Sequence, residues 1–582
     1  MSPDKLVSVI VQTPAKPKRG LTSAIDQSNG DVRMAFQNVD AMAVDLPLSA
    51  VNALASRSDV KYVSLDKPTE VTGHLEVTTG ASLVRNYGNA STGTINGTGI
   101  GIAILDSGVY STHHTFGARV AASVDFTGEN RTDDRYGHGT HVAAIAAGNN
   151  HVSGAYTGIA PNAKIINVRV LNSQGQGTTS AAIAGIDWCI TNKAAHNIRV
   201  LNLSFGAVAR DSYTNDPLCL AVRRAVNAGI VVCVAAGNLG KDSSGNRVLG
   251  AIHSPGIEPS AITVGAANTF GTNSRSDDQV ASYSSRGPTR GYYTDASGMK
   301  HYDNIIKPDL VAPGNKIIAA EAPGNNLLLQ NPTLDAPVSL YDPHDMMYMS
   351  GTSMATPAVA AAVALMLQRN PALTPNLVKV ALQYTAQPLA GFGTCEQGAG
   401  LLNIEGAVRL AGLIRQDLTG LILGAPLLVG AAPAQSTTIG GASFVWGGGI
   451  LQKWNFLTGS NLILKYQGIY GLGTLLADGV ILSNGTLLAD GRLITDGTLL
   501  SDGTLLADGT TLRGGTLLTH GTLLADGTLL SDGTLLSDGR LLSDIFITQT
   551  TPASALSTLA QSALNGDLTP SMLPEPDLGL PD

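Results

Sequence analysis

Apolar and polar residues alternate along short stretches near the start of the chain. The stretches 5–12, 41–46 and 60–65 alternate or run apolar as strands do. Apolar residues within 48–58 instead follow the spacing of a helix. Together, the strand-like alternation and the helical spacing predict a small α+β unit over residues 1–75.

Residues 76–412 have a different pattern, in which apolar runs are followed by segments with helical periodicity. Continuous apolar strands are typical of a parallel sheet that is buried on both faces by helices. We therefore predict an α/β fold with a parallel sheet layered by helices. The runs are 100–105, 164–170, 199–203, 230–235 and 262–264, and the clearest helical segments are 178–192 and 217–227.

The last third of the chain begins with a segment that has no clear period, residues 413–472, which we assign to a connector. From Gly473 to Gly539 a glycine then recurs every six residues, which gives twelve hexads over residues 473–544. Most hexads read Gly-Thr-Leu-Leu-Ala/Ser-Asp. Because six is a multiple of two, each hexad presents the same residues on the same face of a strand, and we predict an all-β repeat.

Two β structures fit the hexads: a solenoid of short rungs, and a meander with Asp-Gly turns. We favour the solenoid, because strands of four residues form poor hairpins without a second layer. Nine hexads end in Asp, for which turn chemistry is the favoured interpretation and calcium binding the alternative. The polar tail, residues 545–582, is predicted to be disordered or loosely docked.

The composition indicates a globular chain with several units: 582 residues, of which 43% are hydrophobic and 14% charged. A net charge of −8 without a basic patch argues against nucleic acid as the main partner. Four cysteines are too few for a disulfide framework. Cys233 lies in an apolar run, where a buried thiol is favoured over a bridge.

No stretch has the pattern of a targeting signal or a membrane span. The first residues lack the basic and apolar regions of a secretory signal peptide, so either export is absent or the natural start lies upstream. The apolar stretch 421–434 is short and is interrupted by Gly424, Pro426 and Gly430. A buried or linker role is therefore favoured over a membrane span.

Three motifs supply an acid, a base and a nucleophile. Asp106 directly follows the apolar run 102–105, His138 stands in Gly-His-Gly-Thr-His, and Ser353 stands in Gly-Thr-Ser-Met-Ala-Thr-Pro ahead of a helical run. Acyl transfer needs a hydroxyl activated by an imidazole that a carboxylate orients. His141, three residues after His138, remains an alternative base at this point.

In sequence and order, these motifs resemble the subtilisin-like serine proteases (subtilases, peptidase family S8), and the resemblance covers residues 1–412. It implies a three-layer α/β fold, His138 as the base, and chemistry that requires no cofactor. It also implies that residues 1–75 are an inhibitory propeptide, cut between Leu65 and Thr79. By the same resemblance the protein is extracellular or attached to the cell surface.

The resemblance extends to the substrate cleft. Asn238 ends an apolar run, and its side-chain amide can donate a hydrogen bond to a developing oxyanion, as the matching asparagine of the family does. Two segments resemble the family's cleft strands, to which an extended peptide adds as a further strand. Their residues are Ser204, Phe205, Gly206, Ala235, Ala236 and Gly237.

Two positions depart from the family pattern. His253 stands where relatives often carry a small residue at the floor of the pocket, which predicts a narrowed or polar pocket. The stretch 113–116 lacks the carboxylate with which many relatives bind calcium, although Asn149 and Asn150 retain part of the loop. We therefore name no metal ligands, and calcium stays an alternative without support at the family's usual site.

The sequence thus predicts a serine endopeptidase that is made as an autoprocessed zymogen and acts on protein or peptide substrates. The alternative is a catalytically silent surface adhesin or scaffold that binds through the hexads. Because an inactive relative usually lacks a member of the triad, the intact set of Asp106, His138 and Ser353 favours the enzyme. Self-association and attachment to a surface are both compatible with the repeat.

Overall fold

The computed structural model describes most of the chain, which divides into two compact units, Met1–Val71 and Thr72–Asp582. Each unit has its own hydrophobic core. The described residues are 6–37, 39–65, 74–149, 154–339, 342–422, 424–471, 479–481, 487–489, 566–572 and 574.

The first unit is an antiparallel sheet with two helices, in agreement with the α+β pattern. Its elements are β1 (Leu6–Gln12), α1 (Arg19–Gln27), β2 (Asp31–Ala35), β3 (Ala41–Pro47), η1 (Leu48–Ala50), α2 (Val51–Ala55) and β4 (Tyr62–Leu65). The strand order is β2-β3-β1-β4. The alternation in β1 places Val9 and Val11 in the core beside Leu21 and Ile25 of α1.

The second unit is built on an eight-stranded sheet, and the predicted α/β fold with a parallel sheet is confirmed. The strand order is β13-β12-β10-β8-β5-β7-β6, with β16 paired to β12 and only β13 antiparallel. The strands are β5 (Gly101–Asp106), β6 (Val120–Asp125), β7 (Lys164–Arg169), β8 (Ile198–Leu203), β10 (Val231–Ala235), β12 (Ile262–Asn268), β13 (Gln279–Val280) and β16 (Leu310–Pro313).

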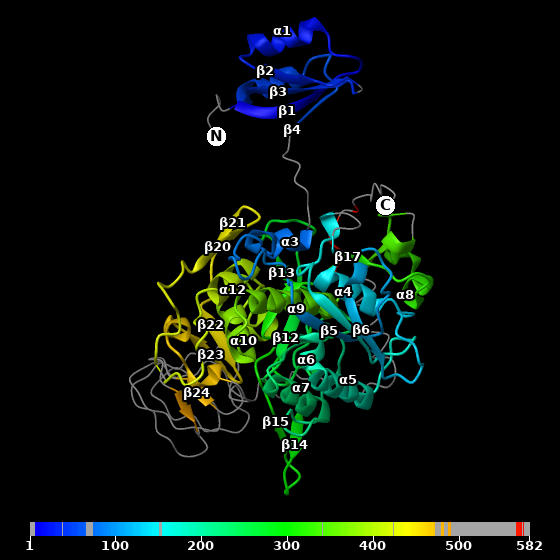
Figure 1. The fold of residues 1–582 in the computed structure, drawn as a ribbon. Helices are drawn as coiled ribbons and strands as arrows, with labels where there is room; N and C mark the ends of the chain where they lie inside the picture. The colour runs from blue at the N-terminus through cyan, green and yellow to red at the C-terminus, as the bar shows by residue number, and fades with distance from the viewer. Residues whose placement is uncertain are drawn as a thin grey trace. The chain divides into compact units, whose positions relative to one another are not determined.

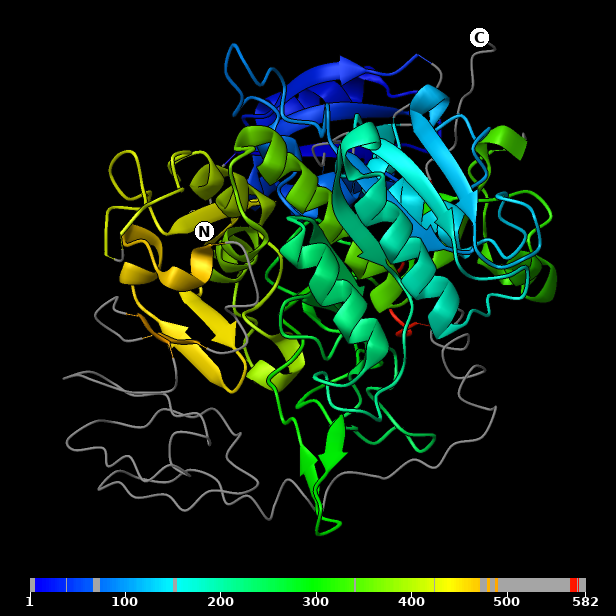
Figure 2. The same ribbon diagram turned by 60° about the horizontal axis from the view of Figure 1, so that its bottom comes forward.

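Helices cover both faces of this sheet (Figure 1). On one face lie α4 (His138–Ala147), α9 (Thr352–Arg369), α10 (Pro375–Thr385) and α12 (Ile404–Ala411). On the other face α5 (Thr179–Thr191) and α7 (Pro217–Asn227) lie side by side, as Figure 2 shows. Almost all of α9 is buried, because its many alanines allow close packing against β8, β10, β12 and α4.

Smaller elements complete the second unit. The helical ones are α3 (His74–Thr78), η2 (Ser82–Val84), η3 (Gly117–Arg119), η4 (Gly154–Tyr156), α6 (Lys193–His196), α8 (Asn326–Gln330), η5 (Pro332–Leu334), η6 (Asp342–His344) and α11 (Thr394–Gln397). The strands are β9 (Ala207–Val208), β11 (His253–Ser254), β14 (Tyr292–Thr294), β15 (Lys300–Tyr302), β17 (Ile317–Ala320), β18 (Asp335–Ala336) and β19 (Met346–Met349).

Residues 413–472, which the sequence pattern assigns to a connector, contain two hairpins within their described part. Trp446, Ile450 and Leu457 belong to the same core as α10 and α12. The segment has no clear period because its strands are short and each contributes few buried residues. Its elements are β20 (Ser436–Ile439), β21 (Ala442–Val445), β22 (Gly449–Gln452), β23 (Asn455–Thr458), α13 (Asn461–Leu464) and η7 (Gly468–Tyr470).

Most of the hexad repeat lies outside the described residues. The two stretches of it that are described, β24 (Gly479–Ile481) and β25 (Leu487–Ala489), come from neighbouring hexads and pair antiparallel. Antiparallel pairing of neighbours is what the meander requires, whereas the rungs of a solenoid stack in parallel. At this point of the repeat the structure therefore favours the meander over the predicted solenoid.

Residues 566–572 of the tail dock on the second unit. The carboxylate of Asp567 accepts hydrogen bonds from the backbone N–H and the hydroxyl of Ser282. The N–H of Asp567 donates to Asn315 Oδ1 at 2.7 Å, and Met572 is buried against the main core. The composition of the tail predicts disorder or loose docking. The structure shows that residues 566–572 are docked. No local pattern predicts this, because their hydrogen-bond partners Ser282 and Asn315 lie far away in the sequence.

Within the described part of the chain, no helix is long and apolar enough to cross a membrane. All four cysteines are free thiols, and Cys233 is buried in β10, as its apolar surroundings predict.

Replacement of the buried Met572 tests the docked tail. Met572→Asp is expected to lower the free energy of unfolding by about 2 kcal/mol, because it removes an apolar side chain from the core and places a charge there. Thermal melting should show this as a fall of a few degrees. Leu568→Asp is the matched control, because Leu568 is 94% exposed in the same segment and its replacement should leave the melting temperature unchanged. Identical melting of both variants and the wild type would show that the tail is not docked.

Candidate active site

The acid and the base meet where a strand ends and a helix begins. Asp106 is the last residue of β5, and His138 is the first residue of α4. The Nδ1 of His138 lies 2.8 Å from Asp106 Oδ1, which also accepts the N–H of Ser107 at 2.8 Å. Asp106 is only 1% exposed, so the carboxylate and the imidazole interact with little screening by water.

The surroundings of His138 raise its pKa above the usual value. Burial by itself lowers the pKa, but the carboxylate of Asp106 raises it through its charge and its hydrogen bond, and Asp134 adds to the effect. The charged imidazolium is therefore stabilised at this position. A base that accepts a proton during a reaction needs such stabilisation.

His141, the alternative base, lies in a different environment. Its Nε2 lies 3.1 Å from the carbonyl oxygen of Ile317 and 3.0 Å from that of Met347, and its side chain is fully buried. Burial lowers the pKa of His141 to about 3. Its contacts fit a structural histidine that fastens α4 to β17 and β19.

Ser353 stands at the N-terminal end of α9, beside the backbone N–H groups that begin the helix. Its hydroxyl donates to the carbonyl oxygen of Ser204 at 2.9 Å, and the hydroxyl of Ser204 donates to the carbonyl oxygen of Ser353 at 2.8 Å. This reciprocal pair connects the end of β8 to the start of α9. In this conformation the hydroxyl of Ser353 points to Ser204, while His138 lines the same pocket.

Asn238 follows β10 and is fixed by the residue that precedes the serine. Its Oδ1 accepts the backbone N–H of Thr352 at 2.9 Å and the hydroxyl of Thr352 at 3.1 Å. With its oxygen engaged in this way, the Nδ2 group is the donor end of the amide. The amide lies in the pocket that contains Ser353.

The pocket has a volume of about 530 Å³ and contains most of the residues that the sequence assigns to substrate binding. Ser204, Phe205, Gly206, Ala235 and Gly237 all line it, together with His138, Asn238 and Ser353. Ala236 does not line it: its side chain packs in a separate apolar cluster with Tyr213 and Ile252. Successive residues of an extended segment face opposite sides, which explains why Ala236 points away from its neighbours.

A second carboxylate, Asp134, holds the start of α4. It accepts hydrogen bonds from the N–H of Gly137 at 2.7 Å and from the N–H and hydroxyl of Thr140, both at 2.8 Å. The hydroxyl of Ser107 also donates to it, at 2.9 Å. Asp134 therefore connects the residue after Asp106 to the helix that carries His138.

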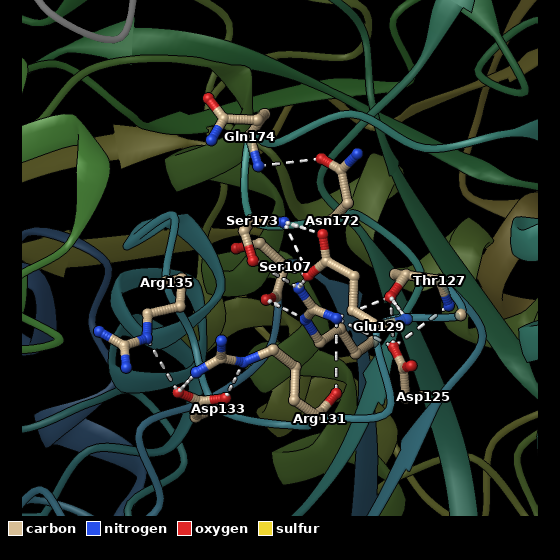
Figure 3. A network of polar contacts seen from close by, with 12 residues as sticks. Ser107, Asp125, Thr127, Glu129, Arg131, Asp133, Arg135, Asn172, Ser173 and Gln174 are labelled. Carbon is tan, nitrogen blue, oxygen red and sulfur yellow. Dashed lines mark hydrogen bonds and ion pairs between the residues drawn. The ribbon is translucent and has the colours of Figure 1, made fainter.

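Arg169 joins this corner to the loops around it, and Figure 3 labels its partners Ser107, Asp125, Thr127, Glu129 and Ser173. Its side chain is fully buried at the end of β7, and its Nε donates to the carbonyl oxygen of Ser107 at 3.0 Å. The rest of the guanidinium contacts side chains of two loops, 125–131 and 171–177, the second of which lines the pocket. These partners are Asp125, Thr127, Glu129 and Ser173.

Among the described residues, no group of three or more His, Cys, Asp or Glu side chains is placed to hold a metal ion. Asn149, which the sequence associates with part of a calcium loop, donates to the side chain of Asn162 and to the carbonyl oxygen of Pro161. Calcium binding by the hexads falls outside this finding, because most of the repeat lies outside the described residues.

A helix-borne hydroxyl that shares a pocket with a histidine, itself paired with a buried carboxylate, defines the class of serine proteases. Comparison with known proteins agrees. The sequence profile of the Subtilase family matches residues 97–407. The chain is 36% identical to serine protease AprX of Bacillus subtilis (strain 168), over 66% of this chain and 82% of the relative. It is 33% identical to subtilisin E of the same organism (66% and 85%) and 31% identical to an alkaline protease of Alkalihalobacillus alcalophilus (69% and 87%).

The chain therefore belongs to the subtilase family, and it is a subtilisin-like serine endopeptidase. Sequence reasoning did not find Asp134 or Arg169. The position of Asp134 could have been noticed in the sequence, since Asp is favoured just before the start of a helix. Nothing in the local sequence distinguishes Arg169, because a single arginine is common where an apolar strand ends.

Removal of the Arg169 guanidinium should strongly destabilise the second unit. Arg169→Met is expected to lower the free energy of unfolding by about 3 kcal/mol, because it leaves the carbonyl oxygen of Ser107 and the partly buried carboxylate of Asp125 without the guanidinium. Arg131→Gln is the control, because Arg131 pairs with Asp133 in the same loop but is more exposed, and its loss should cost at most about 1 kcal/mol. Denaturant unfolding measures both. Equal losses in the two variants would contradict the assigned role of Arg169.

Proposed function

We propose that Asp106, His138 and Ser353 form the catalytic triad of this protease and cleave peptide bonds through an acyl-enzyme. The observation that carries the proposal is the 2.8 Å contact between His138 and the buried Asp106, in a pocket that also contains Ser353. We propose that a rotation about the Cα–Cβ bond of Ser353 turns its hydroxyl from the Ser204 carbonyl towards His138, which lines the same pocket. Catalytic hydrogen bonds often tighten in this way only when substrate is bound.

In the proposed mechanism, Ser353 Oγ attacks the scissile carbonyl while His138 accepts the hydroxyl proton. Asp106 holds the imidazole through Nδ1 and stabilises the imidazolium. His138 then gives its proton to the leaving amine, and a water molecule hydrolyses the acyl-enzyme by the same steps. The raised pKa of His138 supports its role as the proton carrier.

Asn238 and the start of α9 would stabilise the oxyanion. The Nδ2 group of Asn238 and the backbone N–H of Ser353 are both donors near the nucleophile, and the positive end of the helix dipole adds to them. The contacts from Thr352 to Asn238 Oδ1 hold the amide in place before substrate arrives. Donors that are fixed in advance need no reorganisation during the reaction.

The pocket suits an extended peptide, which would add as a strand beside Ser204–Gly206 and pair through its main chain. Side chains of the peptide would then enter the pocket, and the lining would set the preference between them. The substrates are therefore proteins or peptides. The family relationship supports export and action outside the cell or on its surface.

We further propose that the protein is made as a zymogen and that cleavage removes the first unit. The cut falls within residues 66–73, because the residues that follow are anchored in the second unit. His74 is 5% exposed and hydrogen-bonds through its ring to Thr269 and Asn273. A peptide bond in so buried a segment is a poor protease substrate.

The nucleophile is tested by Ser353→Ala. This variant should lose labelling by a fluorophosphonate probe, lose hydrolysis by at least about 10³-fold, and stay at full length. Mass spectrometry of the wild type should find a mature N-terminus between residues 67 and 74. Adding mature wild-type enzyme to the variant tests whether the variant is folded. A folded variant should be cut by the added enzyme at the same place as the wild type. A Ser353→Ala protein that matures by itself would exclude the mechanism.

The pH profile tests the acid–base pair. Activity should fall as the pH drops through the pKa of His138, because the protonated imidazole cannot accept the proton of Ser353. Asp106→Asn removes the charge that raises this pKa, so the acidic limb of kcat/KM should move to lower pH while kcat falls by about 10⁴-fold. Asp187→Asn makes the same charge change at an exposed position of α5 and should alter neither the acidic limb nor kcat. An unmoved acidic limb in Asp106→Asn would exclude the pairing as the cause of the raised pKa.

A further inference from the structure

We propose that His253 makes the pocket selective for a neutral hydrogen-bonding side chain, best a carboxamide (Gln or Asn), on the substrate residue that contributes the scissile carbonyl. The inference rests on the proposed function, since it assumes that peptide is cleaved at Ser353. It adds the chemical class that the pocket accepts. Nothing in the mechanism above uses His253.

The position of His253 is fixed by the backbone around it. It begins β11, which pairs antiparallel with β9, and its N–H donates to the carbonyl oxygen of Ala236 at 3.0 Å. The side chain lies against two glycines of the cleft. A Cβ placed on Gly206 would come within 2.9 Å of His253 Cβ, and one on Gly237 within 2.9 Å of His253 Cγ. The two glycines therefore leave the room that the imidazole occupies in the pocket wall.

The polar atoms of this imidazole have no partner among the described residues. His253 is 2% exposed, and both Nδ1 and Nε2 are buried without a hydrogen bond. A buried polar group without a partner is unfavourable, so most such groups are paired in native proteins. Since His253 lines the pocket, a turn of the ring about its Cβ–Cγ bond would bring a nitrogen to the pocket side, where a bound side chain can supply the missing partner.

The remaining lining decides which side chain suits the site. Among the described residues that line the pocket there is no Asp, Glu, Lys or Arg, so a charged side chain would enter without a counter-ion. The titratable groups besides His253 are His138 and Tyr136. Apolar side chains such as Leu218 form other parts of the wall and can cover the aliphatic carbons of a glutamine.

The protonation state of His253 favours an amide over an ion. Burial lowers the pKa of His253 to about 4, so the ring is neutral at neutral pH. A neutral imidazole has one N–H donor and one acceptor nitrogen. A carboxamide also carries one donor end and one acceptor end, whereas a carboxylate only accepts and an ammonium only donates.

Four peptides test the preference. They are fluorogenic and differ only in the residue before the cleaved bond, which is Gln, Met, Glu or Lys; Gln and Met have nearly the same length and shape. The wild type should cleave the Gln peptide with a kcat/KM about tenfold higher than the Met peptide, as expected for one good hydrogen bond. The Glu and Lys peptides should be poorer than the Gln peptide. Equal kcat/KM for Gln and Met would overturn the proposal.

Three variants assign the preference to His253. His253→Phe keeps a flat ring without nitrogen and should abolish the Gln preference, whereas His253→Gln restores a donor and an acceptor and should retain it. Tyr136→Phe removes the other uncharged polar ring of the pocket and should also retain it. A Gln preference that survives in His253→Phe, or that is lost in Tyr136→Phe alone, would overturn the assignment.

Fluorophosphonate labelling separates the two levels of the argument. A wild-type protein that is not labelled and hydrolyses none of the peptides would refute the proposed function itself. Labelling with hydrolysis but without Gln preference would refute only the role of His253. If His253→Phe is not labelled because it does not fold, the wild-type series and His253→Gln still decide the question.

Discussion

The burial of α9 is the constraint on which the rest of this structure depends. The helix contacts five strands of the sheet and two helices, and almost every residue along it is enclosed. Only its first turn reaches the pocket, and Ser353 stands there. A close-packed interior allows little displacement, so the position of the nucleophile is fixed by the core rather than by a surface loop.

The parallel sheet brings the remaining groups to the same place. Asp106 ends β5, Ser204 follows β8 and Asn238 follows β10, and these three strands are neighbours in the sheet. Since parallel strands end at one edge, residues distant in sequence meet there without long excursions of the chain. His138 joins them because Asp134 and Ser107 fasten the start of α4 to the end of β5.

One network of ion pairs in this unit lies beside the site. Arg169 and the carboxylates of Asp125 and Glu129 support the backbone next to Asp106, whereas the lining of the pocket is uncharged within the described residues. Because the Arg169 side chain is fully buried, the loss of its charged partners would leave an uncompensated buried charge, which is unfavourable. The arrangement keeps the carboxylate rigid while the substrate side remains open to neutral groups.

Part of this structure can be predicted from the identities of the residues and from the periodicity of the apolar positions. They determined the α/β class, because continuous apolar runs alternate with helical segments, and they determined which acid, base and hydroxyl to expect, because each stands in a distinctive motif. Tertiary structure decided the rest. It placed Ala236 away from the pocket, gave His141 two backbone partners in the core, packed residues 413–471 into the main unit, docked residues 566–572, and paired two neighbouring hexads antiparallel. These outcomes depend on contacts between segments or strands, whose energies come from burial and pairing across the fold, and no local pattern along one chain records which partner a side chain will meet.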